Sequence, residues 1–185
     1  MAGRNLAPTR TNLINLSHEL QFAELGRELL DQKRNILVVE LLNLVDQAVD
    51  AEQHMEDALN QAYHDLEEAV LRMGRLGVES VSSSINADAE LSITQRRVMG
   101  VRLPVVDTRI TGHAPYYSPT GTSYWVDTAA DRFKEALDLI GRLVEQKISI
   151  VRLAREVKKT IRKVNALEKI AIPELEVTAK SIRDR

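Results

Sequence analysis

The chain has 185 residues and a formal net charge of −2, and only 4% of its residues are aromatic. Globular cores draw much of their buried area from aromatic side chains, so this composition of aliphatic and charged residues predicts long helices packed side by side. The lack of cysteine excludes a disulfide framework and a thiolate zinc site. No apolar run reaches the roughly 20 residues of a membrane span, and the start MAGRNLAPTRTN lacks a signal peptide's apolar core. We therefore expect a cytoplasmic protein that does not insert into a membrane.

A first long helix is predicted over residues 10–76. From Leu37 to Leu76, apolar and small residues recur at steps of three and four, which makes a heptad seam of more than five periods. Gly74, Gly77 and the run SVSSSINADAE after them are helix-ending signals, so the helix is expected to stop close to residue 76.

The middle region, residues 77–127, has a different composition. In 90-ELSITQRRVMGVRLPVVD-107, polar and apolar residues alternate, which predicts a small two-stranded element that turns near Gly100. Pro104 confines its strand to the edge of a sheet. Because a lone hairpin is barely stable in water, this element is expected to pack on the helix ends or on a partner.

A second long helix is predicted over residues 128–184. Thr128 with Asp131 resembles a capping box, and a seam with steps of three and four continues from Phe133 to Ile182. Its polar members, Lys147, Glu168 and Thr178, are expected to fix the register of the helix pair.

The two predicted helices have matching periods, and their charges are opposite. Residues 19–90 carry 16 Asp/Glu against 5 Lys/Arg, a balance of −11, whereas residues 142–185 carry 12 Lys/Arg against 6 Asp/Glu, a balance of +6. Such arms favour antiparallel pairing within one chain, and the basic arm has no surplus left for nucleic acid. The expected fold is mainly α: a long antiparallel two-helix coiled coil with a small β-hairpin and loop region in the middle, in a single elongated chain of residues 1–185.

Motifs for chemistry are missing. The sequence has neither a phosphate-binding loop nor a dinucleotide-binding glycine pattern. Ala51 and Gln61 stand three residues before His54 and His64, so the paired Glu-x-x-His pattern of di-iron bundles fails. We expect no catalytic residue, no cofactor and no metal site.

Two sets of side chains are candidates for contacts with other proteins. The first is a basic run in the second helix, made of Arg152, Arg155, Lys158, Lys159, Arg162 and Lys163. It is either a solvated face, or a set of partners for the acidic arm, or a contact strip for another protein. The second set is aromatic and consists of Tyr116, Tyr117, Tyr124 and Trp125. These residues either pack the hairpin onto the helix ends or form a docking patch, since Tyr and Trp are enriched at interfaces.

Pro173 stands inside a strongly helical segment, 161-IRKVNALEKIAIPELE-176. A proline in a helix interior removes a backbone donor and clashes with the carbonyl four residues earlier, at a cost of roughly 3 kcal/mol. The expected result is a bend near the end of the second helix.

Three segments resemble one known family, the D subunit of the V-type (archaeal-type) ATP synthase. The segment 161-IRKVNALEKIAIPELEVTAKSI-182 is similar to the family's R-x-V-N-A-L-E and I-P-x-L-E motifs. The start 7-APTRTNLINLSHEL-20, with 26-GRELLDQKR-34, looks like the family's P-T-R-x-x-L opening and its later L-L-x-x-K-R. The middle 98-VMGVRLPVV-106 is similar to its M-G-V-x-x-P turn. The three lie in the family's order and span nearly the whole chain.

The resemblance implies a non-catalytic central rotor shaft that transmits torque between an ATP-hydrolysing or ATP-synthesising hexamer and an ion-translocating membrane rotor. The implied partners are the hexamer of catalytic (A) and regulatory (B) subunits, the small (F) stalk subunit and a membrane-side rotor socket subunit. The shaft's two termini would insert into the hexamer, and the hairpin end would face the membrane rotor. On this interpretation, Pro173 bends the helix inside the hexamer's bore, the basic run contacts the hexamer or the stalk, and the aromatic set docks on the membrane side.

A prefoldin-like coiled-coil chaperone subunit is the main alternative, because it also joins a β-hairpin to a long antiparallel coil. A chaperone of this kind needs apolar helix tips to hold unfolded clients. The two tips here, MAGRNLAPTRTN and SIRDR, are polar and charged. A generic structural spacer is a third interpretation.

Overall fold

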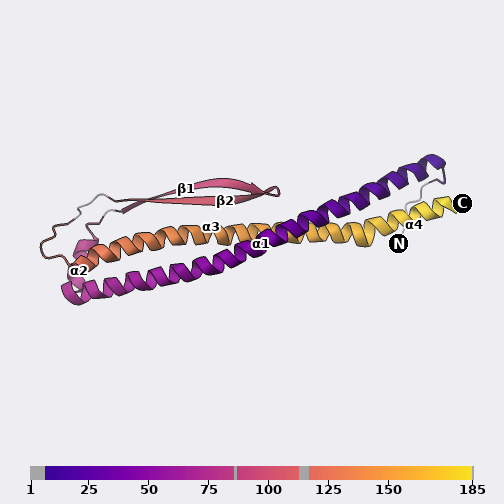
Figure 1. Cartoon of the computed structure of the whole chain (residues 1–185). Helices are drawn as coiled ribbons and strands as arrows, with labels where there is room; N and C mark the ends of the chain where they lie inside the picture. The colour runs from indigo at the N-terminus through magenta and orange to yellow at the C-terminus, as the bar shows by residue number, and fades with distance from the viewer. Residues whose placement is uncertain (1–6, 86, 113–116, 185) are drawn as a thin grey trace. The chain divides into compact units, whose positions relative to one another are not determined.

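The computed structural model describes residues 7–85, 87–112 and 117–184, and 77% of the chain is helical. In chain order, the elements are α1 (Arg10–Met73), α2 (Arg75–Ser82), β1 (Ala87–Val98), β2 (Val101–Gly112), α3 (Tyr124–Ala166), the π-helical segment η1 (Leu167–Ala171) and α4 (Ile172–Arg183) (Figure 1). The long N-terminal helix packs with the C-terminal helices, and a two-stranded antiparallel hairpin lies between them in sequence. The predicted fold class is thereby confirmed. Among the described residues, no helix is both long and apolar enough to cross a membrane.

The chain divides into two compact units. The hairpin unit is the continuous segment Asn43–Arg152, which holds the second part of α1, α2, both strands and the first part of α3. The terminal unit combines the chain up to Leu42 with the chain from Leu153 onward, so it holds the first part of α1, the end of α3, η1 and α4.

Helix α1 begins at a capped end and stops at a glycine. The Thr9 hydroxyl accepts a hydrogen bond from the Asn12 amide at 3.3 Å, which satisfies one of the free donors of the first turn. The sequence predicted that the helix would run to residue 76, but it ends at Met73. The physical reason is Gly74, whose φ of 74° and ψ of 157° interrupt the helix in a conformation that glycine adopts readily. Leu76, expected on the seam, belongs to α2 and is 82% exposed.

Small and aliphatic side chains form the buried seam in each unit. In the hairpin unit it consists of Leu44, Ala48, Ala62 and Ala69 on α1 with Val126, Ala129, Ala136 and Leu143 on α3. In the terminal unit it consists of Leu16 and Leu37 on α1, Leu153, Val157 and Val164 on α3, and Thr178 and Ala179 on α4. Ring contacts are few, and the clearest is an edge-on pair of Tyr63 and Phe133 with centroids 5.4 Å apart.

Helix α3 differs from the prediction at its start and along its seam. It begins at Tyr124 instead of residue 128, and the Thr128 hydroxyl donates to the Tyr124 carbonyl at 3.2 Å, so Thr128 is a helix-interior residue and no cap. Of the polar residues predicted on the seam, Lys147 and Glu168 are exposed and Thr178 is buried. Ser149, Leu153 and Thr160 are also buried, although the prediction did not place them on the seam. At Thr160, apolar character misled the prediction because the buried hydroxyl bonds within its own helix, to the Glu156 carbonyl at 2.9 Å.

The hairpin is longer than its alternating residues indicated, with 12 residues in each strand. Val98 pairs with Val101, so the turn has two residues, Met99 and Gly100. Their φ angles are 48° and 84°, the left-handed conformation at both central positions that suits the twist of a tight hairpin. The turn near Gly100 that the sequence predicted is therefore confirmed.

Candidate functional site

The outer edge of β2 is held against α3 by two hydrogen bonds. The Val106 amide donates to Glu145 Oε2 at 2.9 Å, and Arg152 Nη1 donates to the Arg102 carbonyl at 2.9 Å. Glu145 and Arg152 are seven residues apart and so lie on one face of the helix, two turns from each other. Figure 1 shows the two strands beside the first part of α3, within the hairpin unit.

Gly141 permits this close approach. A Cβ added at Gly141 would lie 2.5 Å from Oγ1 of Thr108 and 3.9 Å from a methyl carbon of Val106. Glycine is the residue that leaves space for such a neighbour. In the sequence, Gly141 is a lone glycine within a helical pattern, and only the packed structure shows its purpose.

The members of the aromatic set differ in their contacts and in their exposure to solvent. Trp125 lies beneath the Arg72 guanidinium, 5.8 Å from ring centroid to Cζ, and its edge meets Tyr124 with centroids 6.2 Å apart. Tyr124 is 74% exposed, so it is the member that presents a large apolar ring to solvent. Tyr116 lies outside the described residues.

Tyr117 donates a hydrogen bond from its hydroxyl to Asp127 in the first turn of α3. Its pKa is raised to about 12, first because burial disfavours the phenolate, and then because Asp127 accepts a hydrogen bond from the neutral hydroxyl and repels the phenolate, with Asp131 adding to that repulsion. Tyr117 therefore ties the loop before α3 to the helix N-terminus as a neutral donor.

The basic run on α3 is divided as well. Arg152 holds the hairpin, as described above. The other five residues are exposed and have no ion-pair partner within the described part of the chain: Arg155, Lys158, Lys159, Arg162 and Lys163. Their spacing of 3, 1, 3 and 1 places them on one face of the helix, which we call the basic strip. The alternative in which these five pair with the acidic arm is not seen.

Ion pairs between the arms involve other residues, and two of these, Lys147 and Glu168, are seam members that were expected to fix the register of the helix pair. In the hairpin unit, Arg132 Nε lies 2.8 Å from Asp65 Oδ2, and Lys147 Nζ lies 2.7 Å from Glu52 Oε1. The Asp65 side chain is only 8% exposed, whereas Glu52 and Lys147 are about half exposed. Asp65 occupies a buried position on α1, where the seam pattern favours an apolar residue. Its partner Arg132 lies outside the basic segment 142–185, so only the register of the two helices identifies the pair.

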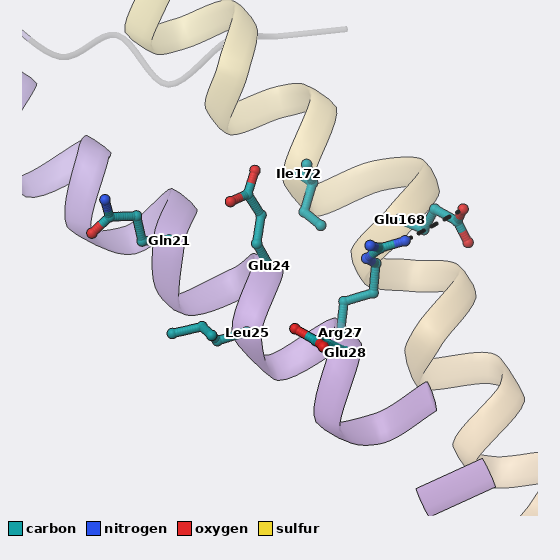
Figure 2. A pocket seen from close by; sticks show the side chains of 7 residues that line it. All are labelled: Gln21, Glu24, Leu25, Arg27, Glu28, Glu168 and Ile172. Atoms are coloured by element: carbon teal, nitrogen blue, oxygen red, sulfur yellow. Dashed lines mark ion pairs between the residues drawn. The ribbon is translucent and has the colours of Figure 1, made fainter. Parts of the chain in front are cut away.

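In the terminal unit, α1 supplies the cation of two ion pairs between the arms and the C-terminal part of the chain supplies the carboxylate, which is the reverse of the hairpin unit. Lys33 on α1 pairs with Glu156 at 3.3 Å, and Arg27 lies 3.9 Å from Glu168. Figure 2 shows Arg27 reaching from α1 toward Glu168 beside an open pocket. The pocket is lined by Gln21, Glu24, Leu25, Arg27, Glu28, Glu168 and Ile172. No group of three His, Asp or Glu that could hold a metal ion occurs among the described residues.

The backbone around Pro173 is unusual. The five residues Leu167–Ala171 are π-helical, and the Ile172 amide donates to the Leu167 carbonyl five residues earlier. Pro173 itself lies in the first turn of α4 and is exposed. A proline at this point lacks an amide and would crowd the carbonyl four residues before it, and a wider turn relieves that crowding. The proline thus coincides with a change of helix type; the bend predicted from the sequence remains a prediction.

Comparison with known proteins matches the chain over almost its full length. The family model for the D subunit of ATP synthase matches residues 12–185. The D subunit of the A-type ATP synthase of Thermococcus gammatolerans is 35% identical over 184 residues, which is 98% of this chain and 86% of the relative. The protein of the same name in Thermococcus kodakarensis is 36% identical over 98% of this chain and 86% of its own, and that of Methanosphaera stadtmanae is 36% identical over 96% and 85%. The chain therefore belongs to the D-subunit family of ATP synthases.

Proposed function

We propose that this protein is the central rotor shaft of an archaeal-type ATP synthase or ATPase, and that it transmits torque without catalysing a reaction itself. The observation that carries the proposal is the family match over residues 12–185, to relatives named as the D subunit of A-type ATP synthases. The antiparallel packing of α1 with the C-terminal helices suits a stiff element that must not bend under load. This match favours the rotor shaft over the prefoldin-like alternative.

The proposed partners are the subunits around such a shaft. The hexamer of catalytic (A) and regulatory (B) subunits surrounds the terminal unit, the small (F) stalk subunit binds alongside, and a socket subunit of the membrane rotor receives the end that carries Tyr124. The protein acts on the cytoplasmic face of the membrane as a peripheral part of the complex. Torque passes in either direction, driven by ATP hydrolysis or by ion flow.

The basic strip is the proposed contact with the hexamer or the stalk. Five exposed cations on one helix face, without ion-pair partners among the described residues, suit an acidic protein surface. Such contacts act mainly on association rate and specificity, and they weaken with salt.

Assembly with the purified hexamer and the small stalk subunit tests the proposal. Size-exclusion chromatography with light scattering should find one copy of this chain in each hexamer. The double variant Lys158→Glu/Arg162→Glu should slow assembly, with a smaller effect at high salt. Its control is Arg75→Glu/Arg142→Glu, which makes the same charge change at two exposed positions of the hairpin unit, outside the unit that the hexamer is proposed to surround. A chain that stays helical and monodisperse but never joins the hexamer would overturn the proposed function, and equal effects of the two double variants would remove the strip from it.

A further inference from the structure

The outer edge of β1 is open. The sheet has only two strands, and every residue from Asp88 to Arg97 is exposed. The outer edge of β2 is used by its hydrogen bonds to α3, but among the described residues no backbone hydrogen bond reaches the corresponding edge of β1. The outer edge of β2 is thus hydrogen-bonded to α3, whereas the outer edge of β1 has no backbone partner among the described residues.

The register identifies the backbone groups that face outward. Val98 and Val101 flank the two-residue turn and form a hydrogen-bonded pair, and bonded and non-bonded pairs alternate from there. On β2, this alternation turns the Arg102 carbonyl and the Val106 amide outward, and both bond to α3. On β1, the same alternation turns outward the amides and carbonyls of Ala89, Leu91, Ile93, Gln95 and Arg97.

Between Leu91 and Gln95, β1 lacks the features that usually protect an edge strand against pairing, because it has no charged side chain there. The strand is 12 residues long, has no proline, and runs in continuous register with β2 without a bulge. Leu91 and Ile93 are 56% and 64% exposed. Proteins usually shorten, bulge or cover such an edge, because it is a template for another strand.

The face that carries Leu91 and Ile93 is half covered. These two residues stand opposite Thr108 and Val106, so all four side chains share one face of the sheet. The β2 half of that face packs on α3 at Gly141, whereas the β1 half is exposed. The same stretch of α3 bears exposed apolar side chains: Leu137, Val144, Ile148 and Val151.

The charge near the hairpin's turn points to the chemistry of the partner. Residues 91–106 include Arg96, Arg97 and Arg102 and no acidic residue. None of the three arginines has an ion-pair partner among the described residues. A strand placed along β1 would therefore be favoured by acidic side chains close to the turn and by apolar ones beside Leu91 and Ile93.

We propose that the open edge of β1 takes up an extended segment of another subunit of the rotary assembly, with acidic residues at its end near Met99 and apolar residues on the side of Leu91 and Ile93. This strand addition rests on the proposed function, because it needs the assembly. It converts the hairpin into a three-stranded sheet between subunits and anchors the partner through main-chain hydrogen bonds.

Amide hydrogen exchange resolved to single residues tests the proposal. In the isolated chain, the outward amides of Leu91, Ile93 and Gln95 should exchange faster than the inward amides of Ser92 and Thr94, which already bond to β2. In the complex with the hexamer and the small stalk subunit, the outward amides should slow by at least about tenfold. Assembly of the complex without that slowing would overturn the strand addition and leave the proposed function standing. A chain that does not join the complex would overturn both.

Two variants of equal charge serve as the matched pair. Ile93→Lys places an ammonium group on the apolar face, and Thr94→Lys places one on the opposite face of the same strand, where the wild-type residue is also exposed. Ile93→Lys should reduce the slowing of the outward amides by about tenfold, since it removes buried apolar area at the contact, and Thr94→Lys should leave it nearly unchanged. Equal effects of the two would contradict the proposal. So would a dimer of the isolated chain with slow outward amides, because the edge would then serve a second copy.

Discussion

At the scale of single residues, Gly141 controls the distance between the hairpin and α3. In Gly141→Ala, the new methyl group meets Thr108 Oγ1 at 2.5 Å, so either the Thr108 side chain must change rotamer or β2 must move away from α3. We expect a loss of about 1–3 kcal/mol in the free energy of unfolding, measured by urea denaturation.

A second glycine provides the control for this change. Gly26 also lies inside a helix, α1, but a Cβ there has nothing within 4 Å, so Gly26→Ala should raise stability by about 0.5–1 kcal/mol through helix propensity alone. In a Thr108→Ala background, Gly141→Ala should cost less than it does alone. A cost that does not depend on Thr108 would show that the contact is not its cause.

Tyr117 makes the stability of the chain depend on pH in the alkaline range. Its folded-state pKa is raised to about 12 from an ordinary value of 10, so the folded state holds the phenolic proton more tightly than the unfolded state does. The stabilisation is fully present below pH 10 and is lost as the pH rises through about 12. In Tyr117→Phe, that alkaline loss should be smaller. Absorbance titration of tyrosinate checks the assignment, because the variant should lack the component with a pKa of about 12.

At the scale of elements, two ion pairs join α1 to α3 in the hairpin unit, and their burial predicts different strengths. Asp65→Ala leaves Arg132 beside a buried site without its carboxylate and should cost about 1–3 kcal/mol of unfolding free energy. Glu52→Ala removes an exposed pair with Lys147 and should cost no more than about 1 kcal/mol, with the loss falling at high salt. Urea denaturation at two salt concentrations measures both. Equal losses would mean that burial does not set the strength of the Asp65 pair.

Some elements could be predicted from the sequence because their signals are local. The heptad steps identify both long helices, and the alternation around Met99 and Gly100 identifies the hairpin and its turn. Local signals failed where two segments meet. The residues around Gly141 do not predict its contact with Thr108, and those around Asp65 do not predict its pairing with Arg132. Each contact depends on the register between elements far apart in sequence.

The surface residues show the same limit. The sequence shows that the run is basic, but it does not show that Arg152 bonds to the hairpin while the other five residues are exposed. Arg152 donates to a carbonyl on β2, and Arg155 three residues later has no ion-pair partner among the described residues. Composition cannot separate these two because both are arginines on one helix, and only the placement of the hairpin distinguishes them.

At the scale of the whole molecule, Pro173 is proposed to matter through the shape it gives the shaft. Pro173→Ala restores a backbone donor and removes the crowding that the π-helical turn relieves, so the isolated chain should unfold at a higher temperature. If the bend makes the shaft touch the hexamer's interfaces unequally, the assembled variant should couple ATP hydrolysis to ion transport less tightly. Parallel measurement of hydrolysis and transport checks this. Unchanged coupling in a stabilised variant would remove the functional role and leave a tolerated irregularity.

The division of the chain into two units has a consequence for how the protein is made. The hairpin unit is one continuous segment, Asn43–Arg152, and all its contacts can form as soon as that segment has left the ribosome. The terminal unit needs residues from both ends of the chain, so the first part of α1 must wait until nearly all of the protein has been synthesised. Contacts so distant in sequence carry the larger entropic cost of loop closure and form late. During synthesis, therefore, the apolar side chains of α1 before Asn43 stay unpacked for the longest time, and a chaperone can bind them throughout that time.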